Sequence, residues 1–91
     1  MVAFGWDDVN LAHLARHRIT PSEAEEVFRN DPVIQAYEVV AAEDRWTALG
    51  ASRSLRVMVL IFTMRDDKIR VVTGWDADKQ TKKVYFTQRG N

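Results

Sequence analysis

The spacing of apolar residues divides the chain into a helical first third and a strand-rich remainder. In residues 5–19 the apolar positions recur every three or four residues and form one helical stripe: Leu11, Leu14, Ala15 and Ile19. Asp7 precedes this stripe and is expected to cap the helix, because a carboxylate accepts hydrogen bonds from the free amides of a first turn. The pattern therefore predicts a first helix within residues 5–19.

Residues 20–32 carry the start and stop signals of a second helix. Thr20 fits the N-cap, Pro21 the first helical position, and Glu23 the returning arm of a capping box. The sequence Asn-Asp-Pro at residues 30–32 is expected to end this helix, since the residue before a proline avoids helical geometry. The buried face is expected at three apolar positions: Ala24, Val27 and Phe28.

Strand patterns follow in four segments: residues 33–40, 45–51, 55–64 and 68–75. The third contains the longest apolar run, residues 57–62, and is expected to be the most buried. The sequence RDDK at residues 65–68 has the composition of a tight hairpin turn between the last two strands. Residues 76–86 are expected to form a short final helix with Asp76 or Asp78 as its N-cap.

These elements predict a single domain over residues 1–91 of the α+β class. Its expected architecture is two N-terminal helices, a four-stranded antiparallel meander and a short C-terminal helix. All the helices are expected to cover one face of the sheet.

The composition indicates the cellular compartment in which the protein is expected. The chain has no cysteine, which excludes disulfides and thiolate metal sites and is typical of a reducing compartment. Its longest apolar run is far shorter than a membrane span, and the N-terminus lacks the pattern of a signal peptide. We therefore expect a cytoplasmic protein with no membrane partner.

The formal net charge is zero, but the two parts of the chain carry opposite charges. Residues 1–51 hold four arginines against nine acids, a net charge of −5, and residues 52–91 hold nine basic residues against four aspartates, a net charge of +5. The basic part favours a nucleic-acid partner. Mutual neutralisation of the two parts within one fold explains the same asymmetry, so both interpretations stay open.

Several short phrases follow one another in a characteristic order: FGWDD, RHRI, EAEEVF, DP, EDRWTALG and VMVLIFTMRDDKIRVVTGWDADKQTKKVY. In this order they resemble the BrnT toxins of bacterial type II toxin–antitoxin systems. The family's corresponding phrases include F-x-W-D, K-H-G-V, E-A-x-x-V-F, E-x-R-F-x-x-I-G and R-I-R-I-I-S-A-R-K-A. The resemblance implies a RelE-like fold and an endoribonuclease that inhibits translation by cleaving RNA, without a metal or cofactor. It also implies an antitoxin partner, expected to be of the ribbon-helix-helix type, and a homo- or hetero-oligomer.

Four positions depart from the family's pattern. Arg18 stands where the family has glycine, and Thr81 stands where it has glutamate. Trp75 and Asp76 replace an arginine and a lysine. A carboxylate would repel a bound phosphate, whereas an indole ring could stack on a base. A catalytically inactive relative that binds protein or RNA is therefore the alternative interpretation.

Cleavage of RNA by its own 2′-hydroxyl requires a base, an acid and cations that hold the phosphate. Imidazole exchanges a proton near neutral pH, and the planar guanidinium group matches phosphate oxygens. The expected catalytic residues are His17, Arg45, Arg70 and Tyr85. The residues expected to bind RNA or its phosphates are Arg16, Trp75, Lys79, Lys82 and Lys83.

Each candidate also has a structural interpretation. His17 fits a helix end, Arg45 fits an ion pair, and the lysines fit a solvated helix face. Trp75 and Tyr85 fit core or interface positions equally well. His13 and His17 have the spacing of a metal-binding pair, but no third ligand stands at a motif distance, so no metal site is expected.

Overall fold

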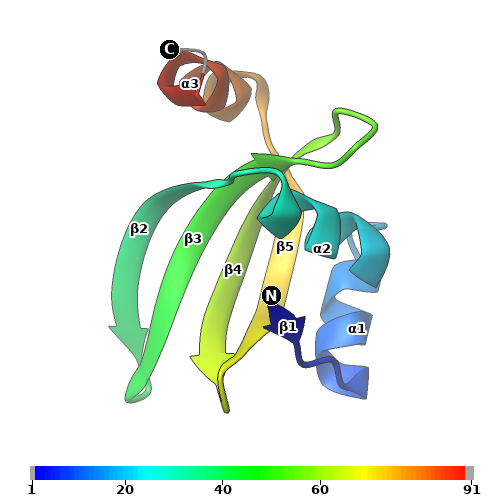
Figure 1. Cartoon of the computed structure of the whole chain (residues 1–91), viewed down its shortest axis with the longest axis vertical. Coiled ribbons are helices and arrows are strands. Elements are labelled where there is room, and N and C mark those ends of the chain that lie inside the picture. The colour runs from blue at the N-terminus through cyan, green and yellow to red at the C-terminus, as the bar shows by residue number, and fades with distance from the viewer. Residues whose placement is uncertain (1, 90–91) are drawn as a thin grey trace.

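The computed structural model describes residues 2–89 and contains, within them, three helices and one five-stranded sheet (Figure 1). The elements are β1 (Ala3–Phe4), α1 (Asp8–Ala15), α2 (Pro21–Arg29), β2 (Val33–Val40), β3 (Glu43–Ala51), β4 (Val57–Arg65), β5 (Lys68–Asp76) and α3 (Lys79–Arg89). The strand order is β1-β5-β4-β3-β2. The α+β class is confirmed. Strands β2 to β5 form an antiparallel meander, but the sheet has five strands and not the predicted four, because β1 is added to it.

Helix α1 is shorter than the predicted span of residues 5–19. Asp7 caps it as expected, because its side chain accepts a hydrogen bond of 2.9 Å from the amide of Asn10. The chain then leaves helical geometry at Arg18, whose φ of 56° is left-handed. The amide of Ile19 donates back to the carbonyl of Leu14 at 3.0 Å, which closes the helix end in a Schellman arrangement. Helix α1 therefore ends at Ala15, and Ile19 packs as a separate anchor.

The capping box of helix α2 is confirmed. The hydroxyl of Thr20 accepts from the amide of Glu23 at 3.1 Å, and the carboxylate of Glu23 accepts from the amide of Thr20 at 3.0 Å. Pro21 occupies the first turn, and the helix ends at Arg29. Local sequence signals thus determine both ends of this helix.

The expectation of a purely antiparallel sheet is wrong. Strand β1 pairs in parallel with β5, with Phe4 opposite Ile69. A strand of two residues has no readable periodicity, so no sequence pattern predicts it. The predicted hairpin turn is confirmed, because Asp66 and Asp67 have φ of 54° and 61°, as a type I′ turn requires.

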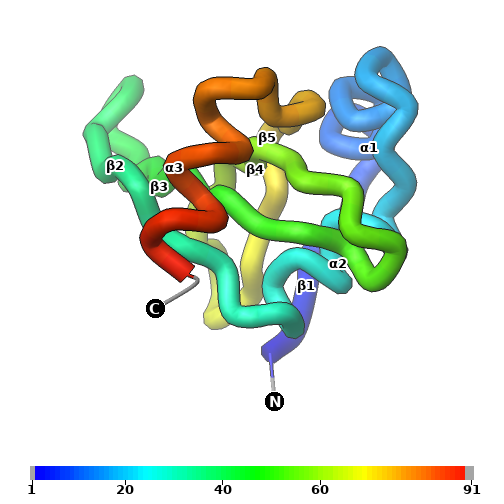
Figure 2. The backbone as a smooth tube through the Cα atoms, turned by 90° about the horizontal axis from the view of Figure 1, so that it is seen from above, coloured from blue at the N-terminus to red at the C-terminus, as the bar shows by residue number. Residues whose placement is uncertain are grey.

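The helices do not share one face of the sheet, which corrects a further expectation. Successive residues of a strand point to opposite faces, and the apolar run of β4 is buried on both. Met58 and Leu60 pack with α1 and α2, whereas Val57 and Val59 pack with Tyr85 of α3. Figure 2 shows α1 and α2 together on one side and α3 crossing above the strands.

Helix α3 begins later than predicted. Asp76 ends β5, and Asp78 is the cap, since its side chain accepts from the amide of Thr81 at 2.8 Å. The helix runs to Arg89 and carries Tyr85 on its buried face. Within residues 2–89, no helix is long and apolar enough to cross a membrane.

Close packing at Gly74 yields a first prediction. A Cβ atom there would lie 2.9 Å from the carbonyl oxygen of Val59 and 2.5 Å from Cδ2 of Leu60, so the Gly74→Ala variant must shift the backbone. We expect it to lower the free energy of unfolding by about 1–3 kcal/mol, measured by urea denaturation. Gly5→Ala is the matched control, because its nearest new contact is 3.8 Å away. Equal stability of the two variants would contradict this packing.

Candidate functional site

One side chain fastens the bend between α1 and α2 to the end of β5. Arg56, in the loop before β4, donates from Nη2 to the carbonyl of His17 at 3.0 Å and from Nη1 to that of Arg18 at 2.8 Å. Its Nη1 also lies 3.2 Å from the carboxylate of Glu23. Its Nε and Nη2 form a two-pronged pair with Asp76, at 2.6 and 3.1 Å. We call these five residues the Arg56 network.

The charges of the Arg56 network compensate one another. Hydrogen bonds from Arg56 are the largest cause that lowers the pKa of Asp76, and the positive charges of Lys82 and His17 act in the same direction. The pKa of Glu23 is lowered first by the amide of Thr20 and then by Arg56. Asp76 replaces a lysine of the family's pattern, but its negative charge is matched by a guanidinium group and does not stand free.

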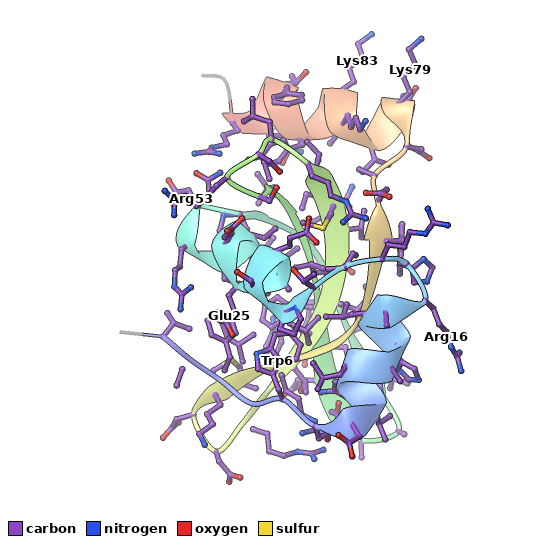
Figure 3. The ribbon with its side chains drawn as sticks, turned by 90° about the vertical axis from the view of Figure 1, so that its right-hand side faces the viewer. Trp6, Arg16, Glu25, Arg53, Lys79 and Lys83 are labelled. Atoms are coloured by element: carbon purple, nitrogen blue, oxygen red, sulfur yellow. The ribbon has the colours of Figure 1, made fainter. Side chains whose placement is uncertain are left out.

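A pocket of about 270 Å³ lies between the end of α1 and strand β5. We call it the corner pocket, and its lining residues are His13, Arg16, His17, Val72 and Thr73. The Nδ1 atom of His13 lies 3.1 Å from the carbonyl oxygen of Val72. The ring of Trp75 lies beyond His17, with 6.5 Å between the two ring centroids. Figure 3 shows Arg16 projecting from α1 into solvent.

Two of the predicted site residues, Arg16 and His17, therefore line the corner pocket, and Trp75 lies next to His17. Arg16 and His17 are exposed, and Trp75 keeps 40% of its surface accessible. Imidazole and guanidinium groups thus line one pocket, with an indole ring beside the imidazole. No cluster of three or more histidine, aspartate or glutamate side chains with metal-binding geometry is found within residues 2–89.

The other predicted catalytic residues lie elsewhere and have structural partners. Arg70 is hydrogen-bonded to Asp7, and this bond, after the amide of Asn10, lowers the pKa of that carboxyl. Arg45 is within 3.5 Å of Glu43. Tyr85 is 1% exposed and accepts a hydrogen bond of 2.6 Å from Arg89. Their catalytic roles stay predictions that this arrangement does not support.

The predicted lysines lie on helix α3. Lys79, Lys82 and Lys83 are all exposed. Figure 3 shows Lys79 and Lys83 projecting away from the sheet. Lys82 interacts electrostatically with Asp76.

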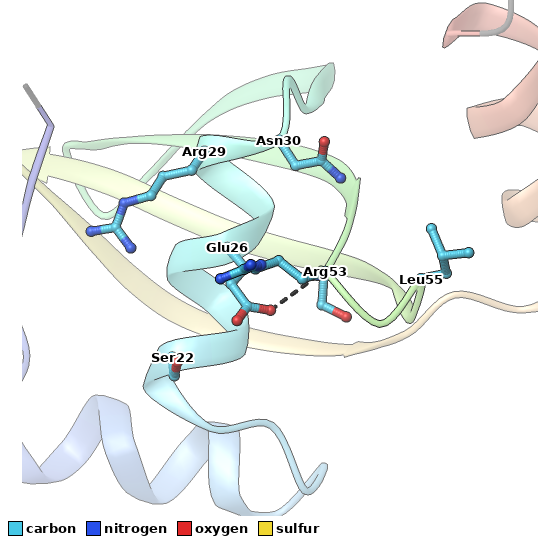
Figure 4. A pocket seen from close by; sticks show the side chains of 7 residues that line it. Ser22, Glu26, Arg29, Asn30, Arg53 and Leu55 are labelled. Atoms are coloured by element: carbon cyan, nitrogen blue, oxygen red, sulfur yellow. Dashed lines mark hydrogen bonds between the residues drawn. The ribbon is translucent and has the colours of Figure 1, made fainter.

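A larger pocket of about 680 Å³ lies between α2 and the loop before β4 (Figure 4). Its lining residues are Ser22, Glu26, Arg29, Asn30, Ser52, Arg53 and Leu55. None of the predicted site residues is among them, and Glu26 is engaged by the backbone amide of Arg53 at 3.0 Å. The larger pocket contains no histidine, so the corner pocket is the stronger candidate for proton-transfer chemistry.

Sequence reasoning missed two residues of this region. His13 is not among the predicted site residues, although its spacing to His17 places both on one helical flank. Arg56 had no local signal, because its partners lie 20 to 39 residues away in sequence.

The Arg56 network makes stability depend on pH. Because the pKa of Asp76 is lowered from its ordinary value of 3.8, the ion pair stabilises the fold fully above about pH 5. As the pH falls below 3.8, the unfolded chain takes up the proton first and this contribution is lost. We therefore expect Asp76→Asn to be less stable than wild type at pH 7, with a difference that shrinks below about pH 4.

Urea denaturation at a series of pH values measures this difference. The exposed Asp31→Asn variant is the control and is expected to stay within about 0.5 kcal/mol of wild type. A difference for Asp76→Asn that is the same at every pH would contradict the ion pair.

Comparison with known proteins agrees with the resemblance seen in the sequence. Residues 6–81 match the family described as the ribonuclease toxin, BrnT, of type II toxin–antitoxin systems. No curated protein matches the chain. The matched span begins at Trp6, takes in the whole corner pocket and the Arg56 network, and ends in α3. The chain therefore belongs to the BrnT family of ribonuclease toxins of type II toxin–antitoxin systems.

Proposed function

We propose that this chain is an endoribonuclease that cleaves RNA at the corner pocket without a metal ion and thereby inhibits translation. The observation that carries the proposal is that His17 and Arg16 line one pocket on the molecular surface, with the ring of Trp75 beside His17. These are the groups required to move a proton, hold a phosphate and stack a base.

Each of the three groups has a distinct task. His17 protonates the departing 5′-oxygen, since imidazole acts as acid or base near neutral pH. The guanidinium of Arg16 binds the phosphate oxygens as negative charge develops on them. The exposed ring of Trp75 stacks on a neighbouring base, a contact worth roughly 1–3 kcal/mol.

The ion pair between Asp76 and Arg56 supports this assignment. A free carboxylate beside the pocket would repel the substrate by about 1 kcal/mol at 4 Å in water. Here Arg56 binds both oxygens of that carboxylate. The replacement of a family lysine by Asp76 therefore does not by itself disable the pocket.

The partner of a type II toxin is an antitoxin protein. We propose that an antitoxin of the ribbon-helix-helix type forms a hetero-oligomer with this chain and covers the corner pocket. The exposed lysines of α3 are further candidates to contact RNA or an acidic antitoxin segment: Lys79, Lys82 and Lys83.

Cleavage of a labelled RNA by the purified chain in the presence of EDTA tests the proposal. We expect cleavage by wild type with 2′,3′-cyclic phosphate ends, and a loss of about 100-fold or more in His17→Asn. Arg53→Ala is the control, since this exposed residue lies outside the corner pocket and should leave the rate unchanged.

Two results would contradict the proposal. Cleavage that stops in EDTA would require a metal. Wild type that binds RNA but leaves it intact would make the chain an RNA-binding relative without activity.

A further inference from the structure

We infer that His13 is the proton acceptor of this site and activates the 2′-hydroxyl of the RNA. The inference rests on the proposed ribonuclease function and goes beyond it, because it gives the two histidines of the corner pocket opposite roles.

A hydrogen bond to the backbone of β5 fixes the ring of His13. Its Nδ1 atom lies 3.1 Å from the carbonyl oxygen of Val72. A carbonyl oxygen only accepts hydrogen bonds, so Nδ1 must carry a proton. In neutral imidazole the other nitrogen, Nε2, then holds a free lone pair. The contact thus sets the tautomer that a general base needs.

The Nε2 atom of His13 is accessible. This atom has no hydrogen-bond partner among the described residues. It is also not one of the buried polar atoms left without a partner, which in residues 2–89 are Nδ2 of Asn10 and Nε of Arg45. His13 is half-buried and lines the corner pocket. Its Nε2 is therefore open to a ligand in that pocket.

Strand β5 is irregular at the residue that contacts the ring of His13. Ile61 pairs with Thr73, and the next residue, Phe62, pairs with Val71, so Val72 is an extra residue in β5. A bulge of this kind disrupts the ladder locally and redirects its backbone groups. The carbonyl of Val72 is turned to His13 in this way. The bulge and the histidine therefore form one unit.

The surroundings of the two imidazoles differ. From α1, His13 has Arg16 and His17 as its charged or titratable neighbours at the pocket, and the facing residues of β5 are Val72 and Thr73. The nearest charged residue before them on β5, Arg70, is paired with Asp7. His17 instead lies near Asp76, with which its positive form interacts favourably. His13 therefore has the carbonyl of Val72 as its hydrogen-bond partner, whereas His17 has the carboxylate of Asp76 as a charged neighbour.

The reaction is then a transesterification within the RNA. Nε2 of His13 takes the proton of the 2′-hydroxyl, and the 2′-oxygen forms a bond to phosphorus. The bond from phosphorus to the 5′-oxygen breaks, and His17 gives its proton to that oxygen. The products are a 2′,3′-cyclic phosphate and a 5′-hydroxyl, and the two histidines exchange their protonation states.

Two variants and two substrates separate the roles. His13→Asn keeps an amide donor toward Val72 but lacks Nε2, and His17→Asn removes the proton donor. The substrates are one RNA that wild type cleaves and the same RNA with sulfur replacing the bridging 5′-oxygen. A thiolate leaves without being protonated. Hence we expect His17→Asn to lose about 100-fold on the oxygen substrate and to recover to near wild-type rate on the sulfur substrate.

His13→Asn is expected to lose about 100-fold or more on both substrates, with unchanged RNA binding and an unchanged thermal unfolding midpoint. Wild-type rates in His13→Asn would overturn the inference, as would recovery of this variant on the sulfur substrate. Absence of cleavage by wild type on either substrate would instead overturn the proposed function.

A measurement on wild type covers the case in which His13→Asn does not fold. Nitrogen-15 NMR of the histidine rings at neutral pH should show Nδ1 of His13 protonated and Nε2 with a free lone pair. The opposite tautomer would overturn the inference.

Discussion

The structure of the candidate site depends on the Arg56 guanidinium. In the bend that follows α1, the carbonyl groups of His17 and Arg18 accept hydrogen bonds from Arg56. The same group binds Glu23 at the start of α2 and Asp76 at the end of β5. One side chain thus connects three elements where the chain reverses direction. The bend that carries His17 is held against the sheet by this group.

This connection also explains part of the charge distribution. Ion pairs link the acidic first part of the chain to the basic second part at three places: Glu23 with Arg56, Glu43 with Arg65, and Asp7 with Arg70. Mutual neutralisation therefore accounts for several of the basic residues. The cations left at the surface, such as Arg16 and the lysines of α3, are the ones available to RNA or to an antitoxin.

The sequence was sufficient wherever a local signal determines the structure. The capping box at Thr20 and Glu23, the turn at residues 66–67 and the span of β2 were predicted correctly. It was insufficient where distant contacts decide. Arg18 adopts a left-handed φ of 56° that favours glycine, the residue of the family's pattern, at a cost of about 1–2 kcal/mol. The local sequence does not indicate that α1 ends before Arg18, or that Arg56 binds the carbonyl of Arg18.

The candidate site likewise contains some residues that could be named from the sequence and others whose roles depend on distant contacts. His17, Arg16 and Trp75 could be named from residue chemistry and family resemblance. The partner of Arg70 lies 63 residues away, so a phosphate contact and a structural pair were indistinguishable in the sequence. The role inferred for His13 needed the bulge at Val72, which depends on the register of two strands.

Arg56 holds the bend between α1 and α2 so that His17 lies beside Trp75. The most direct measurement is the set of nuclear Overhauser effects between the ring protons of these two residues, compared in wild type and Arg56→Met. Wild type should show them, since the ring centroids are 6.5 Å apart. Arg56→Met should lose them while keeping the contacts of Leu14 with the core. A folded Arg56→Met variant that retains them at wild-type intensity would contradict the claim.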